Sequence, residues 1–171
     1  MPKIPKHMRW SKLKKNVESF FSDKVKGKVE LRSASYNRTH DNDGRGYITV
    51  DGKEVWNMCT LNYYSKEYEK TIEQLNVGAE NIGDAQTKGI AELDEEGVYS
   101  QWGYYNYLKD YCSASIDSCL ISDIPLIKSL AMLDSRVGKR KLKAMDVSND
   151  HEMVVYFFKL RCELENIRPS T

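Results

Sequence analysis

Apolar residues recur at helical spacing in the last third of the chain, and the first such run predicts a helix from Ser122 to Ala144. Ser122 is a good N-cap, and Pro125 fits the first turn, where its missing N–H costs little. The apolar positions, separated by four, three and four residues, are Leu126, Leu130, Leu133 and Val137. This spacing places them on one helical face. Gly138 interrupts the helix at a cost of about 1 kcal/mol relative to alanine.

The second run is the most apolar segment of the chain and predicts a buried helix between Asn149 and Pro169. Asn149 and Glu152, three residues apart, resemble a capping box, and Pro169 would end the helix. The positions that repeat at steps of four and three are Met153, Phe157, Leu160, Leu164 and Ile167. Because Val154 and Phe158 widen this stripe, we expect the helix to be buried on most of its circumference.

Alternating apolar and polar residues predict a three-stranded antiparallel sheet near the N-terminus. We expect strands at 28–36, 46–50 and 53–61. The dipeptide Asp51–Gly52 between the last two is a strong hairpin signal. Because the third predicted strand carries apolar residues on both faces, we expect it to be central in the sheet or covered by other elements.

Other helices are predicted before and after this sheet. Residues 10–25 form an amphipathic pattern with lysines off the apolar face, and packing on its own domain is favoured over lying on a membrane. Residues 65–93 contain three glycines and predict one long bent helix or two shorter ones. The apolar positions that repeat there at steps of four, three, four and three are Tyr68, Ile72, Leu75, Ala79 and Ile82. Ser100 is placed to cap a helix that runs to residue 111, and residues 113–120 predict a short linking helix.

These patterns predict an α+β fold, in which an N-terminal helix and a three-stranded antiparallel sheet are packed by a helical C-terminal half. The 171 residues fit a single domain, with a loose leader at 1–8, an α/β-meander part at 9–62 and a helical part at 63–168. The four cysteines show no metal-binding spacing, and no apolar run is long enough for a membrane span. We therefore predict reduced thiols in a cytoplasmic protein without a membrane partner.

Charge is distributed unevenly, although the net charge is only +1. Residues 1–28 hold nine lysines and arginines against Glu18 and Asp23, whereas residues 67–96 hold nine acidic residues against two lysines. These segments either attract each other within the fold or mark separate faces. The small net charge excludes a global field that would drive binding to nucleic acid or membrane.

A basic stripe on the predicted 122–144 helix is the main candidate for a binding site. It consists of Arg136, Lys139, Arg140 and Lys143 and lies about 100° round from the apolar face. Cations near a helix C-terminus complement the macrodipole and keep a surface solvated. Alternatively, they bind phosphate groups or an acidic partner. On such a helix Asp134 does not face Arg136, so we expect Asp134 to find its partner elsewhere in the fold.

The polar loop between the first two strands is the candidate for an enzyme site, through His40, Asp41, Asp43 and Arg45. His40 is suited to general-base chemistry, but no nucleophile is placed beside it by spacing. A calcium-binding loop that began at Asp41 would put Arg45 at a ligand position, so we interpret the loop as a turn. The sequence has no glycine-rich phosphate loop and no HExxH motif. We therefore assign no catalytic residue, no metal and no cofactor.

The segment 99–111 is unusually rich in tyrosine, with Tyr99, Tyr104, Tyr107 and Tyr111. Base stacking and protein interfaces both use such rings. We favour the interpretation that they are core and rim residues whose hydroxyls reach water.

The segment Ala131-Met132-Leu133-Asp134-Ser135-Arg136-Val137-Gly138-Lys139-Arg140 resembles a motif, A-M-L-D-x-R-x-G-K-R, of a family of small uncharacterised bacterial proteins. Segments at 9–14, 48–54 and 160–162 are similar to others in that family, so the likeness spans roughly residues 8–167. The resemblance implies no activity. It implies that Asp134, Arg136, Lys139 and Arg140 act as a unit, either in binding or in structure.

The leading hypothesis is a non-enzymatic binding or interaction protein that contacts an acidic protein or nucleic acid through the 136–143 stripe. The alternative is an enzyme whose site is assembled from the 38–45 loop and distant residues. A third hypothesis is a homodimer that uses the tyrosine-rich helix as its interface.

Overall fold

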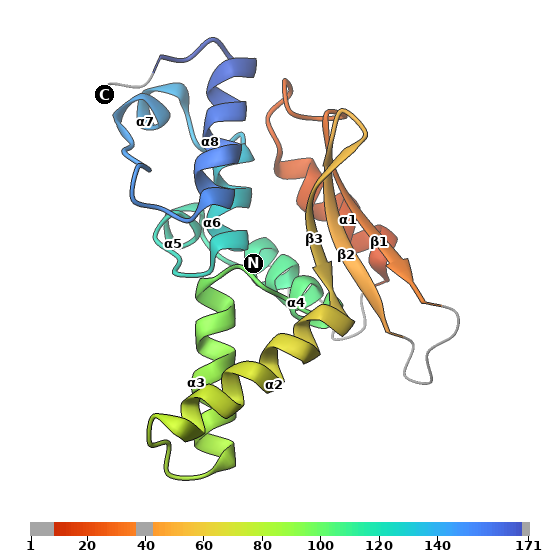
Figure 1. Ribbon diagram of the computed structural model, residues 1–171. Coiled ribbons are helices and arrows are strands. Elements are labelled where there is room, and N and C mark those ends of the chain that lie inside the picture. Colours follow the sequence, from red (N-terminus) through yellow and green to blue (C-terminus); the bar gives the residue numbers. More distant parts are fainter. Residues whose placement is uncertain (1–8, 37–42, 169–171) are drawn as a thin grey trace.

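The computed structural model describes residues 9–36 and 43–168 of the chain (Figure 1). The elements within these ranges are α1 (Trp10–Phe20), β1 (Val29–Ser35), β2 (Gly44–Val50), β3 (Lys53–Cys59), α2 (Thr60–Asn76), α3 (Ile82–Glu95), α4 (Gln101–Ser113), α5 (Ile116–Leu120), α6 (Pro125–Leu133), α7 (Lys139–Ala144) and α8 (Glu152–Leu164). An N-terminal helix and a three-stranded antiparallel sheet are packed by a helical C-terminal half, which confirms the predicted α+β fold.

The sheet is the predicted antiparallel meander, in the order β1-β2-β3. Asp51 and Gly52 both have positive φ, 48° and 77°, as a tight two-residue hairpin turn requires. Of the two alternatives expected for the third strand, central in the sheet or covered by other elements, the structure shows the second, since β2 lies in the middle of the sheet and β3 at its edge. The second apolar face of β3 is covered by α8, where the centre of the Trp56 ring lies 6.1 Å from that of Phe157.

Helices α1 and α4 pack on the sheet and on each other. Leu13, Leu31 and Ile48 are buried where α1 meets the sheet. At Gly46 an added Cβ would come within 2.0 Å of the Tyr104 ring, so only glycine lets α4 lie this close to β2. Tyr104 and Tyr111 of α4, and Tyr99 just before this helix, are buried, and Tyr107 is partly buried, so they are core residues as favoured from the sequence. The expectation that their hydroxyls reach water was wrong for two of them, because the Tyr111 hydroxyl donates to the buried Asp134 and the Tyr104 hydroxyl is itself buried.

The predicted 122–144 helix is two helices joined by an extended segment. Pro125 is in the first turn of α6 as expected, but the N-cap is Ile124 and not Ser122. Helix α6 ends at Leu133 because Asp134 has extended backbone, φ −76° and ψ 130°, and forms a β-bridge with Phe21. This bridge also ends α1 at Phe20, short of the predicted residue 25.

Helix α8 begins and ends away from the predicted residues. Its N-cap is His151, whose Nδ1 accepts the Met153 N–H at 3.1 Å, in place of the expected Asn149. At its C-terminus, Asn166 takes a φ of 53° and the Ile167 N–H reaches the Cys162 carbonyl at 2.8 Å. This Schellman motif stops the helix at Leu164, before Pro169 is reached.

Helices α2 and α3 form an antiparallel hairpin, which we call the arm, that extends away from the rest of the molecule (Figure 1). Of the two forms predicted for residues 65–93, the structure shows two shorter helices. Gly78 separates them with a φ of 102°, while the Ala79 N–H bonds back to the Gln74 carbonyl at 3.0 Å. The connection from α3 to α4 ends with Ser100, whose side chain caps α4 as predicted.

Candidate functional site

The four cations predicted to form a basic helical stripe do not share a helix. Arg136 lies in the extended segment between α6 and α7, and its guanidinium binds the Asp134 carboxylate through Nε and Nη2, at 3.0 and 2.6 Å from Oδ2. The same guanidinium lies 4.2 Å from the centre of the Phe20 ring. Asp134 and Arg136 are thus partners of each other, contrary to the prediction, because extended backbone lets residues two apart point to one side.

Asp134 is the centre of a buried polar cluster. Its side chain is fully buried and also accepts the Tyr111 hydroxyl at 2.5 Å and the Arg136 backbone N–H at 2.8 Å. Burial and the neighbouring carboxylate raise the pKa of Tyr111 well above its ordinary value, and the bond to Asp134 raises the pKa of Arg136. Tyr111 therefore stays protonated as a donor at physiological pH.

Arg161 of α8 secures the same segment from the other side. This buried side chain donates to the carbonyls of Met132, Asp134 and Val137 at 3.2, 3.0 and 3.3 Å. Its Nε binds the Glu165 carboxylate at 2.5 Å. The segment resembling a family motif is consequently held by internal hydrogen bonds of two arginines, which gives it a structural role.

The remaining predicted cations lie on the short helix α7. Lys139 donates to the Glu165 carbonyl at 3.3 Å, and its neighbour Lys141 pairs with Asp117 at 2.6 Å. Arg140 and Lys143 are exposed. Arg136 is also exposed in part, but its charge is paired with Asp134, so fewer free cations face solvent here than the sequence indicated.

A surface pocket of about 490 Å³ adjoins this region, with Ser22, Lys24, Lys139, Arg161 and Glu165 in its lining. Burial acts to raise the pKa of Glu165, but the Ser22 hydroxyl and the Arg161 guanidinium lower it below its ordinary value. Because Arg161 and Glu165 neutralise each other, the buried charges of this pocket offer no group poised for proton transfer.

The loop proposed as an enzyme site is described only in part, since His40 and Asp41 lie outside the described residues. Asp43 is buried, and Arg45 binds both carboxylate oxygens of Glu54 at 2.7 and 2.8 Å. The Arg45 guanidinium also lies 4.3 Å from the centre of the Tyr47 ring. Arg45 thus bridges neighbouring strands of the sheet.

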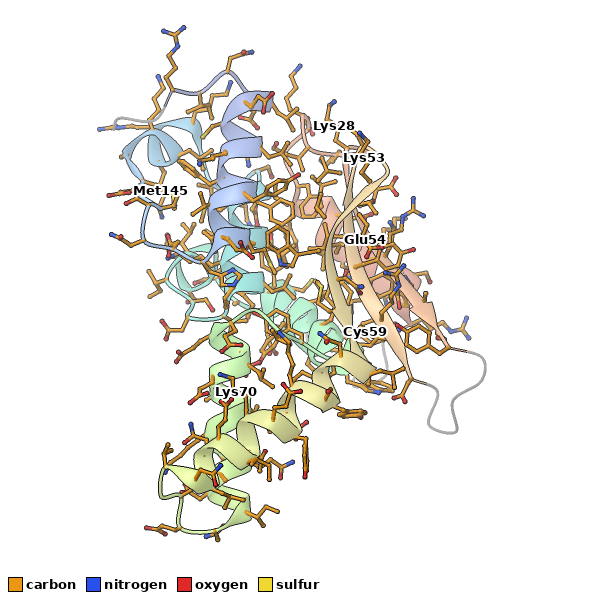
Figure 2. The ribbon with its side chains drawn as sticks, viewed as in Figure 1. Lys28, Lys53, Glu54, Cys59, Lys70 and Met145 are labelled. Atoms are coloured by element: carbon orange, nitrogen blue, oxygen red, sulfur yellow. The ribbon has the colours of Figure 1, made fainter. Side chains whose placement is uncertain are left out.

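Cys59 has chemistry that the sequence reasoning missed. Figure 2 shows it where β3 ends and α2 begins, and it is the N-cap residue of α2. Burial acts to raise the pKa of its thiol, but hydrogen bonds from the Tyr36 hydroxyl, 3.1 Å away, and from the backbone N–H groups of Asn62 and Leu61 lower it below the ordinary value. The sequence pattern assigns Cys59 only to a strand. Its position at the junction of a strand and a helix is the signal that would have indicated a lowered thiol pKa.

The arm carries apolar side chains that the fold leaves exposed. Four apolar side chains on α2 are aligned at steps of three, four and four residues and face solvent: Leu61, Tyr64, Tyr68 and Ile72, with 51, 51, 69 and 39% of their surface exposed. We call these four residues the α2 stripe. Tyr68 and Ile72 belong to the apolar repeat noted in the sequence, as does Ile82, which is 70% exposed.

The two helices of the arm pack through residues outside the stripe, and Leu93 of α3 is among those that are buried. Thr71 is buried in α2, and Ala85 and Gly89 are buried in α3. An added Cβ at Gly89 would lie 3.0 Å from the Lys70 Cβ, so small residues set the separation of the two helices. The stripe therefore faces solvent. Helical periodicity shows that its residues share a face, but it does not show whether that face is buried.

Residues 9–36 and 43–168 lack two kinds of feature. Within them, no group of three or more histidine, cysteine or acidic side chains is arranged to hold a metal ion. No helix in this part of the chain has the length and apolar character needed to cross a membrane.

The comparisons with known proteins agree with the resemblance noted in the sequence. A family model matches residues 9–162, from the start of α1 into the last turn of α8. The chain belongs to the SF0329 protein family. The family match includes both the Asp134 cluster and the α2 stripe. No curated protein and no solved structure matches the chain.

Proposed function

We propose that this SF0329 family member is a non-enzymatic interaction protein that binds another protein through the α2 stripe. The observation that supports the proposal is the alignment of four exposed apolar side chains on an arm that stands away from the core. Contiguous apolar surface of this kind is typical of protein–protein contacts, whereas single exposed apolar residues need no explanation. Tyrosine, moreover, is enriched at binding hot spots.

The proposal includes the cellular setting expected from the sequence. The protein would act in the bacterial cytoplasm, where reducing conditions keep thiols free. All four cysteines are free in the structure, and Cys119 and Cys162 are buried.

A second candidate function is salt-dependent binding of nucleic acid or an acidic protein by α7. The exposure of Lys139, Arg140 and Lys143 favours it. Binding of labelled single- and double-stranded nucleic acid across a salt series tests this function, with all three residues changed to Glu as the comparison. Arg136 must remain unchanged in that variant, because its loss would disturb Asp134.

Site-specific photo-crosslinking in the cells of origin tests the leading proposal. A benzophenone amino acid replaces Tyr68 in the stripe or, as the control, the exposed Lys159 on α8. We expect a discrete crosslinked protein from position 68 that disappears when Ile72→Ser is added. Absence of an adduct at position 68, or an equal adduct at position 159, would overturn the assignment of the stripe.

A further inference from the structure

The arm is strongly acidic. Between Thr60 and Glu96 it holds nine Asp or Glu residues against three lysines. Two of the lysines are neutralised within the arm: Lys70 lies 3.1 and 2.8 Å from carboxylate oxygens of Glu92 and Glu96, and Lys88 lies 2.9 Å from Asp84. Figure 2 shows Lys70 on the arm. Any partner of the stripe therefore meets an excess of negative charge.

The described part of the basic N-terminal segment, residues 9–28, does not neutralise this charge through ion pairs. The ion pairs formed by its lysines join them to Glu18, Asp23 and Asp51. None of these acceptors belongs to the arm, so no ion pair of the described residues joins the two oppositely charged segments.

Two carboxylates border the stripe on one side. Glu69 and Glu73 each follow a stripe residue, Tyr68 and Ile72, and are displaced from it by about 100° round the helix. Glu69 is exposed, and the Glu73 side chain, whose carboxylate lies 3.8 Å from the Lys70 Nζ, is 66% exposed. An apolar strip with carboxylates along its flank complements a surface that has an apolar strip and flanking cations.

The length of the stripe indicates the shape of its partner. The eleven steps along the helix from Leu61 to Ile72 correspond to about 16 Å, or three helical turns. Side chains at spacings of three and four along one helix are matched by an amphipathic helix laid against them.

We infer that the α2 stripe binds a cationic amphipathic helix of a partner protein, an inference that rests on the proposed function. The charge of the arm decides against other occupants. Phosphates of nucleic acid and anionic lipid headgroups are repelled by its carboxylates. A second copy docked stripe to stripe would bring two acidic arms together.

Fluorescence anisotropy with synthetic helices about 14 residues long tests this inference on the full chain. The probes are a leucine–lysine amphipathic peptide, a leucine–glutamate peptide of the same pattern, and a serine–lysine peptide without the apolar face. We expect the leucine–lysine peptide to bind at least about tenfold more tightly than either of the others. Tyr68→Ser with Ile72→Ser should weaken its binding by at least about tenfold.

Two further variants separate the apolar and ionic contributions. Glu69→Gln with Glu73→Gln should weaken binding about two- to fivefold at low salt and less at high salt. Val77→Ser with Ile82→Ser, a matched control at the exposed tip of the arm, should leave binding unchanged. Equal binding of the leucine–glutamate peptide, or full binding by the Tyr68/Ile72 variant, would overturn the inference.

Light scattering and the crosslinking experiment distinguish this inference from the function on which it rests. A partner crosslinked at position 68, together with no binding of the leucine–lysine peptide, would refute the cationic helix and leave the interaction function standing. If position 68 gave no crosslinked partner and the leucine–lysine peptide did not bind, both the interaction function and the cationic helix would be refuted. A dimer in light scattering whose crosslink joins two copies would assign the stripe to a second copy and overturn the inference.

Discussion

The surroundings of Asp134 and the arm differ in how they accommodate side chains that are unfavourable where they lie: buried charges at Asp134, and solvent-exposed apolar groups on the arm. Asp134 and Arg161 are buried charges, yet each is surrounded by partners that satisfy it, including Tyr111, Arg136 and Glu165. The α2 stripe consists of apolar side chains that the fold leaves in water. Residues of the first kind are explained by folding alone, whereas folding does not explain residues of the second kind, which we propose a partner covers.

This difference corrects a natural inference from the sequence. The motif with its arginines and lysines resembled a binding surface, and the apolar repeat of α2 resembled a core face. In the structure the motif residues Asp134 and Arg136 hold two helices and a β-bridge together, and the apolar repeat is exposed. Changes at the two regions should therefore differ in kind, with stability lost at one and binding lost at the other.

The largest effect is expected at Asp134. Asp134→Ala removes the acceptor of Tyr111 and leaves Arg136 without its carboxylate, so we expect a loss of about 3–5 kcal/mol in the free energy of unfolding. Urea denaturation measures it. The control is Asp117→Ala, which removes an exposed partner of Lys141 and should cause a much smaller loss because solvent screens this pair. Equal losses would contradict the structural role of Asp134.

Glu165 should make the free energy of unfolding depend on pH. Its pKa is lower in the folded than in the unfolded state, so its contribution is complete above the ordinary value of 4.5 and is lost as the pH falls through the folded-state pKa. Glu165→Gln should cost about 1–3 kcal/mol at pH 7 and progressively less toward pH 3. If the free energies of unfolding of the unchanged protein and of Glu165→Gln differed by the same amount at every pH in this range, the pairing with Arg161 would be disproved.

Substitutions in the stripe should have little effect on folding. Because Tyr68 and Ile72 are exposed, replacing either with Ser uncovers no buried side chain. We expect each change to alter the free energy of unfolding by less than about 0.5 kcal/mol. Leu93→Ala, at a buried position of the same arm, should cost about 2–5 kcal/mol and serves as the comparison. A loss of that size at Tyr68 or Ile72 would mean that the stripe belongs to the core.

The smallest effect is expected on the reactivity of Cys59, where β3 ends and the arm begins. Because its pKa is lowered, iodoacetamide should alkylate Cys59 faster than Cys112, whose pKa is raised by burial to about 11. Tyr36→Phe removes a hydrogen bond to the sulfur and should slow alkylation of Cys59 about two- to fivefold at pH 7.5. Mass spectrometry of digested samples gives both rates, and an unchanged rate would show that Tyr36 does not stabilise the thiolate.

Local signals in the sequence were sufficient for much of the fold. Alternation placed the three strands, Asp51–Gly52 marked the hairpin, and Ser100 marked a helix start, because each depends on the backbone of a few neighbouring residues. The break at Asp134 was missed for the opposite reason. Its extended backbone is imposed by a bridge to Phe21, more than 100 residues earlier, and no local pattern reports it.

The candidate site was harder to predict than the fold. Helical periodicity shows that Tyr68 and Ile72 share a face, but which face is buried depends on where α3 packs. That choice is set by Thr71, Ala85 and Gly89, which carry little hydrophobic signal of their own. Likewise, Arg136 could be assigned to a basic surface only as long as its helix was thought to continue past Leu133.

The most direct test of the account is photo-crosslinking from position 64 of the stripe in three backgrounds. These are the otherwise unchanged chain, Ile72→Ser, and Arg140→Ser with Lys143→Ser. If the arm is the contact surface, the adduct should persist in the α7 variant and fall at least about fivefold with Ile72→Ser. An adduct that survives Ile72→Ser but is lost with Arg140 and Lys143 would return the binding function to the basic helix and contradict the account.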